Sequence, residues 1–587
     1  MMYTKELDMT KPNKILPNMN EITPFDPSEC EYIKEKANFL RNDLVACLND
    51  PMTGGVSAEN VQVIKFHGMY TQDDRDLRNE RQAKKLEPKY SYLVRIRMAG
   101  GVVTPKQWNE MDSFSATSTI PTLKLTTRQA VQYHGILKRD LVECHRSLVS
   151  VGLDSIATAG DVNRNVMCVA NPADSSVHQE VHKISADLSD YLLPKSTAYY
   201  EIMCDDKKIT PKTSDDQEPI YGKYYLPRKF KINFTIPPQN DNDIWANDIS
   251  FVAIEKNGKL EGFNVMIGGG LGHTHGDDST FPRLATTIGY IDKDQVTEMA
   301  EAILTIQRDY GNRTNRKNAR LKYTVDRLGV DFFKEEIAER VSFKVQDEQA
   351  FEITDNNDRY GWVKGANGKW NYTVFVEGGR VIDVDDYPMK KGFRAISEIL
   401  KGHFVLTGNQ NLIIADIVEA DKKQIEDILV EYKIMEHQDI SGLRGAAIAC
   451  VALNTCPLAM AEAERYLPVL ISKLEGIFAK HGLRDQPVNI RMTGCPNGCG
   501  RSILGEIGFV GKSMGKYQMY LGASHTGHRL AGLFADNVGE EQIIDLLTPI
   551  IEDYAKNRNK NERFGDFTVR KAYVREVFDG KTFNELV

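Results

Sequence analysis

The sequence predicts a mixed α+β fold that is duplicated internally with pseudo-twofold symmetry. Segments with the period-two alternation of strands are interspersed with segments of helical apolar spacing along the 587 residues. One order of features occurs twice: a Gly-Gly pair, an amphipathic segment, an apolar strand and the letters L-T-x-x-Q. Gly100-Gly101 precede Leu125 in the first copy, and Gly378-Gly379 precede Leu406 in the second at a nearly constant offset.

Two further correspondences support the duplication. The same offset carries Cys168 in NVMCVANP onto Cys450 in AIACVALN, and a smaller offset carries Thr235 in FTIPPQND onto Thr493 in MTGCPNGC. The chain is therefore predicted to hold two degenerate copies of one unit. Two such copies can enclose one large cofactor at their junction.

Local patterns predict the elements of the first half in order. Residues 1–88 are polar and rich in loop formers, with one helix expected at 30–48, and are interpreted as an extended arm. Residues 90–98 alternate as a strand that ends at Gly-Gly, so that Arg95 and Arg97 share one face. An amphipathic segment at 106–114 and a strand at 122–125 follow. The letters TTRQ at 126–129 suit a helix N-terminus or an anion-binding turn.

The later elements follow from the same patterns. Helices are expected at 178–193, 294–310, 457–481 and 537–558, and strands at 230–236 and 249–255. Pro457 suits the first turn of its helix, directly after Cys456. The residues after Cys499, RSILGEIGF, are expected to begin a helix that points its N-terminal amides at this region.

Composition excludes several classes of protein. A net charge of -8 and a pI near 5.9 leave no basic surplus for general nucleic-acid binding. A hydrophobic content of 41% and a charged content of 27% are typical of a globular protein, and no apolar run is as long as a membrane span. The first residues carry neither the apolar core of a secretory signal nor an Arg/Ser-rich import pattern, so a cytoplasmic location is expected.

Four cysteines form the most informative pattern. Cys450 and Cys456 are spaced C-x5-C, and Cys495 and Cys499 are spaced C-x3-C, each pair in a short loop after an apolar strand. Grouped thiolates hold zinc or an iron-sulfur cluster; the first spacing is too wide for a zinc knuckle, which favours a 4Fe-4S cluster. Zinc, unligated thiols and disulfides remain alternatives. The other cysteines are scattered, which disfavours disulfides: Cys30, Cys47, Cys144, Cys168 and Cys204.

A family resemblance rests on these cysteine segments and on motifs along most of the chain. CVALNTCPLAMAEAERYLP and MTGCPNGCGRS resemble the cluster signature of the sirohaem-containing sulfite and nitrite reductases. Within that family the resemblance is strongest to the haemoprotein (beta) subunits of NADPH-dependent assimilatory sulfite reductases. The further matching motifs are FHGMYTQDDRD, LTTRQAVQYHGIL, DVNRNVMC, YLPRKFK, IPPQNDND, NGKLEGFNVMIGGGLG, DYGNRTNRKNARLKYT, NQNLII and FGDFTVR.

The resemblance implies a three-domain architecture that encloses one sirohaem and one 4Fe-4S cluster. After the N-terminal arm (1–88), it implies a domain of paired ferredoxin-like half-domains (89–150 and 358–436). A sirohaem- and substrate-binding α/β domain (151–345) and a domain binding the cluster and sirohaem (437–587) complete it.

The resemblance also implies the cofactor ligands. Cys450, Cys456, Cys495 and Cys499 would bind the cluster, and Cys499 would also be the axial ligand of the sirohaem iron. Sirohaem is a polycarboxylate, so its pocket needs cations and amide donors. The residues in the matching motifs are Arg128, Gln132, His134, Asn163, Asn165, Arg228, Gln239, Asn240, Asn497 and Arg501. Lys124 stands where the family leads us to expect arginine, which keeps the charge but weakens bidentate contact with a carboxylate.

Four basic residues are expected at the substrate: Arg97, Arg164, Lys229 and Lys231. Lys229 and Lys231 alternate around Phe230, so both ammonium groups point the same way and each makes the other more acidic. Arg97 is preferred to Arg95 because it stands nearer the Gly-Gly turn.

The activity implied is the six-electron reduction of sulfite to sulfide in sulfate assimilation and cysteine biosynthesis. No flavodoxin-like or pyridine-nucleotide module is recognisable, so a flavoprotein (alpha) subunit with FAD, FMN and the NADPH site is the expected partner; a ferredoxin is less favoured. Nitrite reduction is the alternative within the family, where asparagine often replaces the second lysine; Lys231 favours sulfite. A non-catalytic iron-sulfur or zinc-binding scaffold is the alternative from another class.

Overall fold

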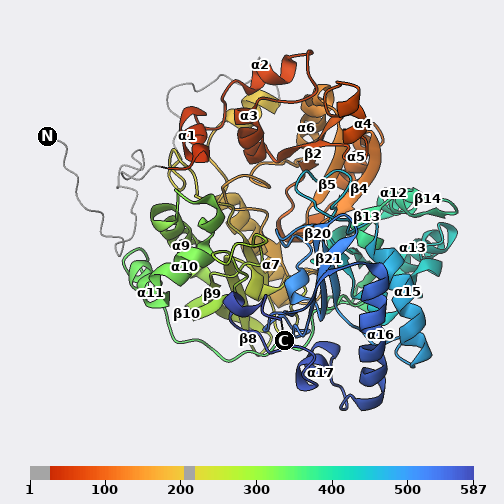
Figure 1. Ribbon diagram of the computed structural model, residues 1–587. Coiled ribbons are helices and arrows are strands. Elements are labelled where there is room, and N and C mark those ends of the chain that lie inside the picture. The colour runs from red at the N-terminus through yellow and green to blue at the C-terminus, as the bar shows by residue number, and fades with distance from the viewer. Residues whose placement is uncertain (1–26, 204–217, 587) are drawn as a thin grey trace.

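The computed structural model describes residues 27–203 and 218–586, which form a mixed α+β structure (Figure 1). Cys204 and the first 26 residues of the expected arm lie outside the described residues. No helix in the described ranges combines the length and apolar composition needed to cross a membrane.

Two five-stranded sheets, called here the first and second repeat sheets, contain the Gly-Gly motifs. The first has the order β1 (Met69–Asp73), β2 (Tyr90–Arg95), β5 (Val131–Ile136), β4 (Ile120–Leu125), β13 (Arg380–Val381). The second has the order β11 (Gly361–Lys364), β12 (Trp370–Val374), β17 (Leu412–Ile417), β16 (His403–Leu406), β3 (Val102–Val103). Each repeat therefore donates one edge strand to the sheet of the other, which locks the two together.

The Gly-Gly pairs explain how the edge strands cross over. Gly100 and Gly378 have φ values of 61° and 56°, a backbone conformation that residues other than glycine rarely adopt. A Cβ on Gly101 would lie 2.6 Å from the carbonyl oxygen of Leu406, so the crossing also needs a residue without a side chain. The repeat in the sequence thus corresponds to a repeated backbone geometry.

Two further sheets, which belong to what we call the first and second α/β units, share one topology. The first contains β6 (Met167–Cys168), β7 (Ile232–Thr235), β8 (Ile249–Lys256), β9 (Lys259–Ile267) and β10 (Thr286–Asp292). The second contains β18 (Ile448–Ala449), β19 (Ile490–Thr493), β20 (Ile507–Ser513), β21 (Lys516–Leu521) and β22 (Gly532–Val538). In both sheets the first three strands are parallel and the last two antiparallel.

The strand register corrects one sequence correspondence by a residue. Cys168 pairs with Phe234 in the first α/β unit, and Ala449 pairs with Met492 in the second. The amide of Cys168 donates to Gln129 as that of Ala449 donates to Gln410. Cys168 is therefore the counterpart of Ala449, and the alignment of Cys168 with Cys450 was wrong.

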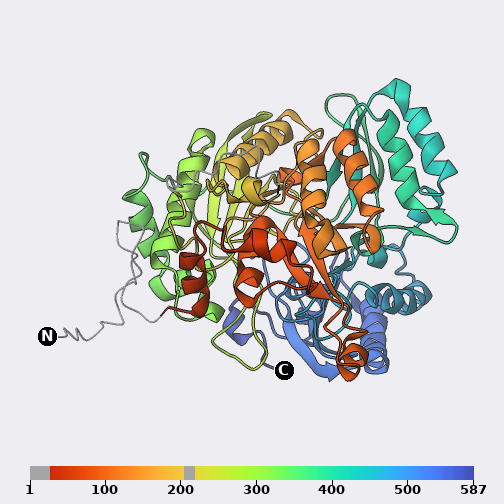
Figure 2. The same ribbon diagram turned by 90° about the horizontal axis from the view of Figure 1, so that it is seen from above.

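The helices cover the outer faces of the sheets. Figures 1 and 2 show α9 to α11 on one side of the molecule and α15 to α17 on the other, with α5 packed against α12 over the repeat sheets. Their bounds are α1 Glu29–Lys36, α2 Leu44–Asn49, α3 Ala58–Val63, α4 Arg78–Ala83, α5 Pro105–Ser115, α6 Leu141–Ser150, α7 Ser176–Tyr191, α8 Ala198–Met203, α9 Val296–Tyr310, α10 Leu321–Leu328, α11 Val330–Ala338, α12 Met389–Ile399, α13 Glu419–Glu431, α14 Gly442–Gly445, α15 Leu467–Lys480, α16 Glu540–Asn557 and α17 Phe564–Arg570.

Several expected helices differ from the structure. The helix expected at 30–48 is split into α1 and α2 by residues with positive φ at 38–40 and 42. The helix expected at 457–481 begins only at Leu467, because the amides of Met460 and Ala461 donate to Gly494 instead of to a helical turn. The residues after Cys499 form a 3-10 turn that leads into β20, not a helix.

Candidate active site at the junction of the two copies

The four cysteines of the two motifs lie in loops that follow β18 and β19. The Gly494 amide donates to the Cys450 Sγ at 3.3 Å, and the Asn497 side-chain amide donates to the Cys495 Sγ at 3.5 Å. All the described cysteines are free thiols. Burial raises the pKa of the Cys450 thiol, and the sulfurs of Cys499 and Cys495 raise it further. The four sulfurs therefore face one another closely enough to interact.

The two cysteine loops approach each other closely. Within the part of the chain that the structure describes, no group of three His, Cys, Asp or Glu side chains is arranged to hold a metal ion. A Cβ on Gly494 would lie 2.6 Å from the Ala461 carbonyl oxygen, so glycine permits the close approach of the two loops.

The first repeat holds these loops in place. The Asn454 side chain donates to Asp74 at 3.0 Å, and the Arg75 guanidinium donates to the carbonyl oxygens of Ala459 and Cys456 at 2.5 and 3.3 Å. The Thr127 hydroxyl, in the TTRQ turn, donates to the Cys499 carbonyl oxygen at 2.9 Å. TTRQ is thus a turn before β5, and it positions the last cysteine.

A cavity of about 460 Å³, counted with the solvent at its mouth, borders Cys499. No carboxylate side chain is among the residues that line it, whereas four cations are. The lining residues are Thr127, Arg128, Met167, Lys231, Asn242, Ala246, Asn247, Leu271, Gly272, Arg320, Asn497, Gly498, Cys499 and Arg501. Converging cations and amides beside a thiol suit an anionic, metal-containing ligand.

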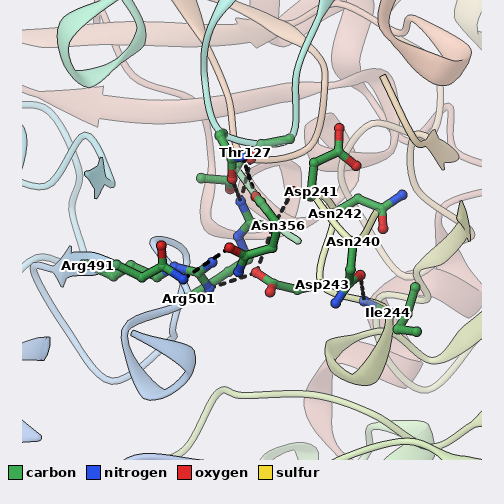
Figure 3. A network of polar contacts seen from close by, with 12 residues as sticks. Thr127, Asn240, Asp241, Asn242, Asp243, Ile244, Asn356, Arg491 and Arg501 are labelled. Atoms are coloured by element: carbon green, nitrogen blue, oxygen red, sulfur yellow. Dashed lines mark hydrogen bonds and ion pairs between the residues drawn. The ribbon is translucent and has the colours of Figure 1, made fainter. Parts of the chain in front are cut away.

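Buried polar contacts hold the cations of this pocket. Asp243 accepts from Arg501 and from Arg491 at 2.7 Å each, and Figure 3 shows its carboxylate between the two guanidinium groups. The Arg128 guanidinium donates to Asn247 at 2.9 Å and to a backbone carbonyl at the same distance. Burial lowers the pKa of Arg128 to about 9, although the nearby carboxylate of Asp248 favours the charged form and raises it. The pocket therefore carries more positive charge than its surroundings neutralise.

A second group of cations lies beside Tyr70. The guanidinium groups of Arg95 and Arg164 both donate to the Thr158 carbonyl oxygen, at 2.9 and 3.0 Å, and Arg95 lies 5.5 Å from the centre of the Tyr70 ring. Burial would raise the pKa of Tyr70, but Arg164, Arg95 and Lys229 outweigh it and lower the pKa to about 7. An anion is therefore favoured here.

Lys229 of the R-K-F-K motif lies near this cationic group, and Lys231 lines the pocket beside Cys499. Burial lowers the pKa of Lys229 to about 7, with further lowering by Arg228 and Arg320. Burial also lowers the pKa of Lys231, and the neighbouring Lys229 adds to the effect. Neither ammonium group has a carboxylate partner among the described residues.

Arg97 does not lie with this group. β2 ends at Arg95, and the Arg97 side chain forms ion pairs with Asp154 at 2.8 Å and Asp190 at 2.6 Å. These two carboxylates neutralise its charge. Of the four basic residues expected at the substrate, Lys229 lies near Arg164, and Lys231 lines the neighbouring pocket. Arg95, not Arg97, shares the Thr158 carbonyl oxygen with Arg164.

The residues expected to bind the cofactor fall into four groups. Arg128, Asn497 and Arg501 line the pocket. Asn163 and Arg228 lie next to the cationic group: Asn163 forms a β-bridge with Phe230, and the charge of Arg228 lowers the pKa of Lys229. Gln132 and His134 lie on β5. With the Gln132 amide turned so that its oxygen faces Arg95, that oxygen accepts from the Arg95 guanidinium at 2.7 Å. Asn165, Asn240 and Gln239 are engaged elsewhere: Asn165 bonds the backbone at 98 and 128–129, Asn240 bonds Thr526 and Ile244, and Gln239 lines a different pocket.

These residues fit a polycarboxylate cofactor next to an iron-sulfur cluster. The Nε atoms of Arg128 and Arg501 and the Oδ1 of Asn163 are buried without a hydrogen-bond partner in the described part of the chain. Unpartnered guanidinium donors and uncompensated charge are costly unless an anionic ligand completes them. Cys499, one of the four thiols, supplies a soft ligand at the wall of the same pocket.

Tyr70, Thr127, Asn247 and Arg320 are site residues that local pattern did not single out. Arg320 forms an ion pair with Asp248 at 2.7 Å and lines the pocket. Three of them belong to matching motifs, namely Tyr70 in FHGMYTQDDRD, Thr127 in LTTRQAVQYHGIL and Arg320 in DYGNRTNRKNARLKYT, whereas Asn247 lies four residues beyond IPPQNDND. Their roles depend on contacts between segments that are distant in the chain.

Comparisons with known proteins agree with this geometry. The family model described as "Nitrite and sulphite reductase 4Fe-4S domain" matches residues 186–345, and "Nitrite/Sulfite reductase ferredoxin-like half domain" matches 84–151 and 363–432. The four cysteines lie outside these ranges. A relative from Bacillus pumilus named "Sulfite reductase (NADPH) hemoprotein beta-component" is 52% identical over 558 residues, 95% of this chain and 98% of the relative. The relative of the same name from Anoxybacillus flavithermus is 51% identical over 559 residues, with the same coverage.

A solved structure is also similar. The Mycobacterium tuberculosis NirA protein matches with a TM-score of 0.74 at 23% identity, over 93% of this chain and 97% of that one. At this identity the match concerns the fold alone. The predicted fold class is confirmed.

Proposed function

From the premise that this chain belongs to the nitrite and sulphite reductase family, we propose that it reduces sulfite to hydrogen sulfide with six electrons. It acts as the haemoprotein component of an NADPH-dependent sulfite reductase, in sulfate assimilation and cysteine biosynthesis. One observation carries the proposal: Cys499 borders a cavity whose lining contains four cationic side chains and no carboxylate. The residues of that lining match what the cofactors and an oxyanion substrate require.

The cofactors are sirohaem and a 4Fe-4S cluster. Cys450, Cys456, Cys495 and Cys499 would hold the cluster, and Cys499, which faces the pocket, would also hold the sirohaem iron. The two groups together supply an electron-storing centre at which the sulfur of sulfite is reduced. Arg128, Arg320 and Arg501 would bind the sirohaem carboxylates, since guanidinium matches carboxylate in a bidentate manner.

The substrate would be held by Arg95, Arg164, Lys229 and Lys231. We place Arg95 in the role first expected of Arg97, because Arg95 shares the Thr158 carbonyl oxygen with Arg164, whereas Arg97 is paired with two carboxylates. The guanidinium groups orient the sulfite oxygens. Each oxygen leaves as water, and a lysine with a pKa of about 7, as at Lys229, can donate a proton near neutral pH.

The electron donor would be a flavoprotein component with the NADPH site, which the resemblance implies; the relatives' names specify NADPH and a beta-component. Leu458 and Met460, 64% and 40% exposed, directly follow the ligand Cys456. Exposed large apolar side chains beside the cluster suit a transient contact with an electron donor. The free thiols suit the reducing cytoplasm.

One sample tests the proposal. The purified protein should show the absorption of an isobacteriochlorin, with about five irons and four acid-labile sulfides per chain, as one coupled centre requires. It should form sulfide from sulfite with NADPH and a flavoprotein component. A protein that stays colourless after reconstitution with sirohaem and iron would overturn the proposal. Nitrite is the second candidate substrate, and Lys231 favours sulfite over it.

A further inference from the structure

The loops after β7 and β19 are equivalent in the two copies, although only one carries cysteine. Asp243 in the first loop and Arg501 in the second both have positive φ, 53° and 58°, and each begins a 3-10 turn. The sixth residue after β7 is Asp241, and the sixth after β19 is Cys499. Asp241 therefore occupies, in the first copy, the position of the thiol that borders the active-site pocket in the second.

A separate cavity of about 420 Å³, counted with the solvent at its mouth, lies beside Asp241. It is lined by the loop after β6, the loop after β7, the segment 357–359 and strands β11, β12 and β17 of the second repeat sheet. The cysteine loops of the other copy lie in the corresponding way against the first repeat sheet, through the contact of Thr455 with His134 on β5. This cavity is thus the pseudo-symmetric counterpart of the cluster site.

Two buried polar groups that line this cavity lack partners. Asp241 is 5% exposed; its Oδ2 accepts from the Ala170 amide at 3.0 Å, and its Oδ1 has no partner among the described residues. The buried Asn371 side chain likewise leaves its Nδ2 unpartnered. Figure 3 shows the Asp241 carboxylate directed away from the Asp243–Arg501 pair. An unpartnered buried carboxylate oxygen is costly, so it requires a proton or a cation.

The electrostatics of the cavity agree with a missing cation. Burial raises the pKa of Asp241 to about 7, and the carboxylate of Asp358, which also lines the cavity, raises it further. The Asp358 oxygens accept only from neutral groups, namely Thr407, Asn409 and Asn411. Arg359, a cation in the lining, is paired with Asp174.

The donor atoms indicate which cation fits. The polar side chains of the lining are carboxylates, amides, one hydroxyl and the paired Arg359, without histidine or cysteine. Oxygen ligands select hard cations. Three carboxylates line the cavity, and because Asp174 is paired with Arg359, Asp241 and Asp358 remain for a cation. Mg²⁺ binds in this way, through one or two carboxylates and several retained waters.

We propose that this cavity binds one hydrated Mg²⁺ ion between Asp241 and Asp358, at the place that corresponds to the iron-sulfur cluster of the other copy. Of the four cysteines of the second copy, Cys499 has a hard counterpart in the first, the carboxylate of Asp241. The ion ties the first α/β unit to the second repeat sheet. It also steadies the Asp241 backbone, whose carbonyl oxygen accepts from Arg501 at 3.3 Å.

Equilibrium dialysis of the cofactor-loaded protein against millimolar Mg²⁺, followed by metal analysis, tests the proposal. The unaltered protein should retain about one Mg²⁺ per chain. Asp241→Asn should abolish this uptake, and Asp358→Asn should reduce it strongly. Asp416→Asn is the matched control, because Asp416 lies on β17 and pairs with Lys369 but does not line the cavity; it should bind Mg²⁺ normally.

Thermal unfolding provides a second readout that separates binding from misfolding. Saturating Mg²⁺ should raise the Tm of the unaltered protein and of Asp416→Asn by about 2 °C, and that of Asp241→Asn not at all. Without Mg²⁺, Asp241→Asn should be at least as stable as the unaltered protein at pH 8, because it removes an unpartnered buried charge. Equal Mg²⁺ uptake by the unaltered protein and Asp241→Asn, or no uptake by either, would overturn the proposal.

Discussion

The ammonium nitrogen of Lys124 lies 2.7 Å from a carboxylate oxygen of Glu464. Lys124 is on β4 of the first repeat sheet and Glu464 is in the loop that follows Cys456, so the pair joins the two copies. Arg380 pairs with the same carboxylate at 2.7 Å, and the Glu464 amide donates to the Cys450 carbonyl oxygen. The ammonium group of Lys124 therefore holds the loop that follows Cys456. It pairs with Glu464 and not with a cofactor carboxylate, the contact expected at this position.

Replacing Lys124 by methionine should destabilise the protein by about 3 kcal/mol, because it leaves a buried carboxylate with one cation instead of two. Urea unfolding of cofactor-free protein measures the change. Lys84→Met is the control: Lys84 pairs with Glu80 at 2.6 Å on the exposed face of α4, and its loss should cost about 0.5 kcal/mol or less. Equal shifts for both variants would contradict the structural role of Lys124.

Glu464 should contribute to the acid sensitivity of the protein. Burial alone would raise the pKa of Glu464, but Lys124 and Arg380 outweigh it and lower the pKa to about 2 from its ordinary 4.5. The folded pKa is the lower one, so this stabilisation is complete above pH 4.5 and is lost as the pH falls toward 2. Glu464→Gln should unfold less steeply with acid between these values in a circular dichroism titration. An unchanged acid profile would show that other groups govern it.

Arg95 and Arg97 should separate catalysis from stability. Arg95→Ala should lower kcat/KM for sulfite by about 100-fold or more, since it removes a donor aimed at an anion. Arg97→Ala should leave kcat/KM close to the parent value and instead reduce stability by about 1–3 kcal/mol, because Asp154 loses its partner. Steady-state kinetics and urea unfolding of both variants test this assignment. A large loss of kcat/KM in Arg97→Ala, with little change in Arg95→Ala, would instead place Arg97 at the substrate.

The contrast between these two arginines shows what the sequence could predict. The repeat, the glycine turns and the grouping of the four cysteines are local or periodic, so residue patterns carry them. Residues 95 and 97 share a face only while the strand continues, and β2 ends at Arg95. The partners that decide their roles, Thr158 and Asp154, come from a distant segment. Likewise, α15 begins ten residues later than expected because the Met460 amide donates to Gly494. Apolar spacing alone cannot reveal such a contact.

Lys231 should set the preference between sulfite and nitrite. Lys231→Asn removes an ammonium group without a carboxylate partner from the pocket and should lower kcat/KM for sulfite by about 100-fold. Nitrite has one oxygen fewer to remove as water, so its kcat/KM should fall much less, and the ratio of the two should shift toward nitrite. Lys256→Asn, at the exposed end of β8, is the control and should change neither value. An equal loss of both activities would contradict a discriminating role.

Leu458 should matter only when the physiological partner supplies the electrons. Leu458 is exposed two residues after Cys456, and a negative charge that becomes buried there on docking would oppose association with a protein that must approach the proposed cluster closely. Leu458→Glu should therefore lower the NADPH-dependent rate with the flavoprotein component by about 10-fold or more, a loss of about 1.4 kcal/mol in association. The rate with a small-molecule viologen reductant should not change, because such a donor needs no docking surface. Val430→Glu, at a side chain that is 60% exposed on α13, provides a control of equal charge at a distant surface. If Leu458→Glu lowers both rates alike, the substitution has damaged the cluster loop, and the donor must approach elsewhere.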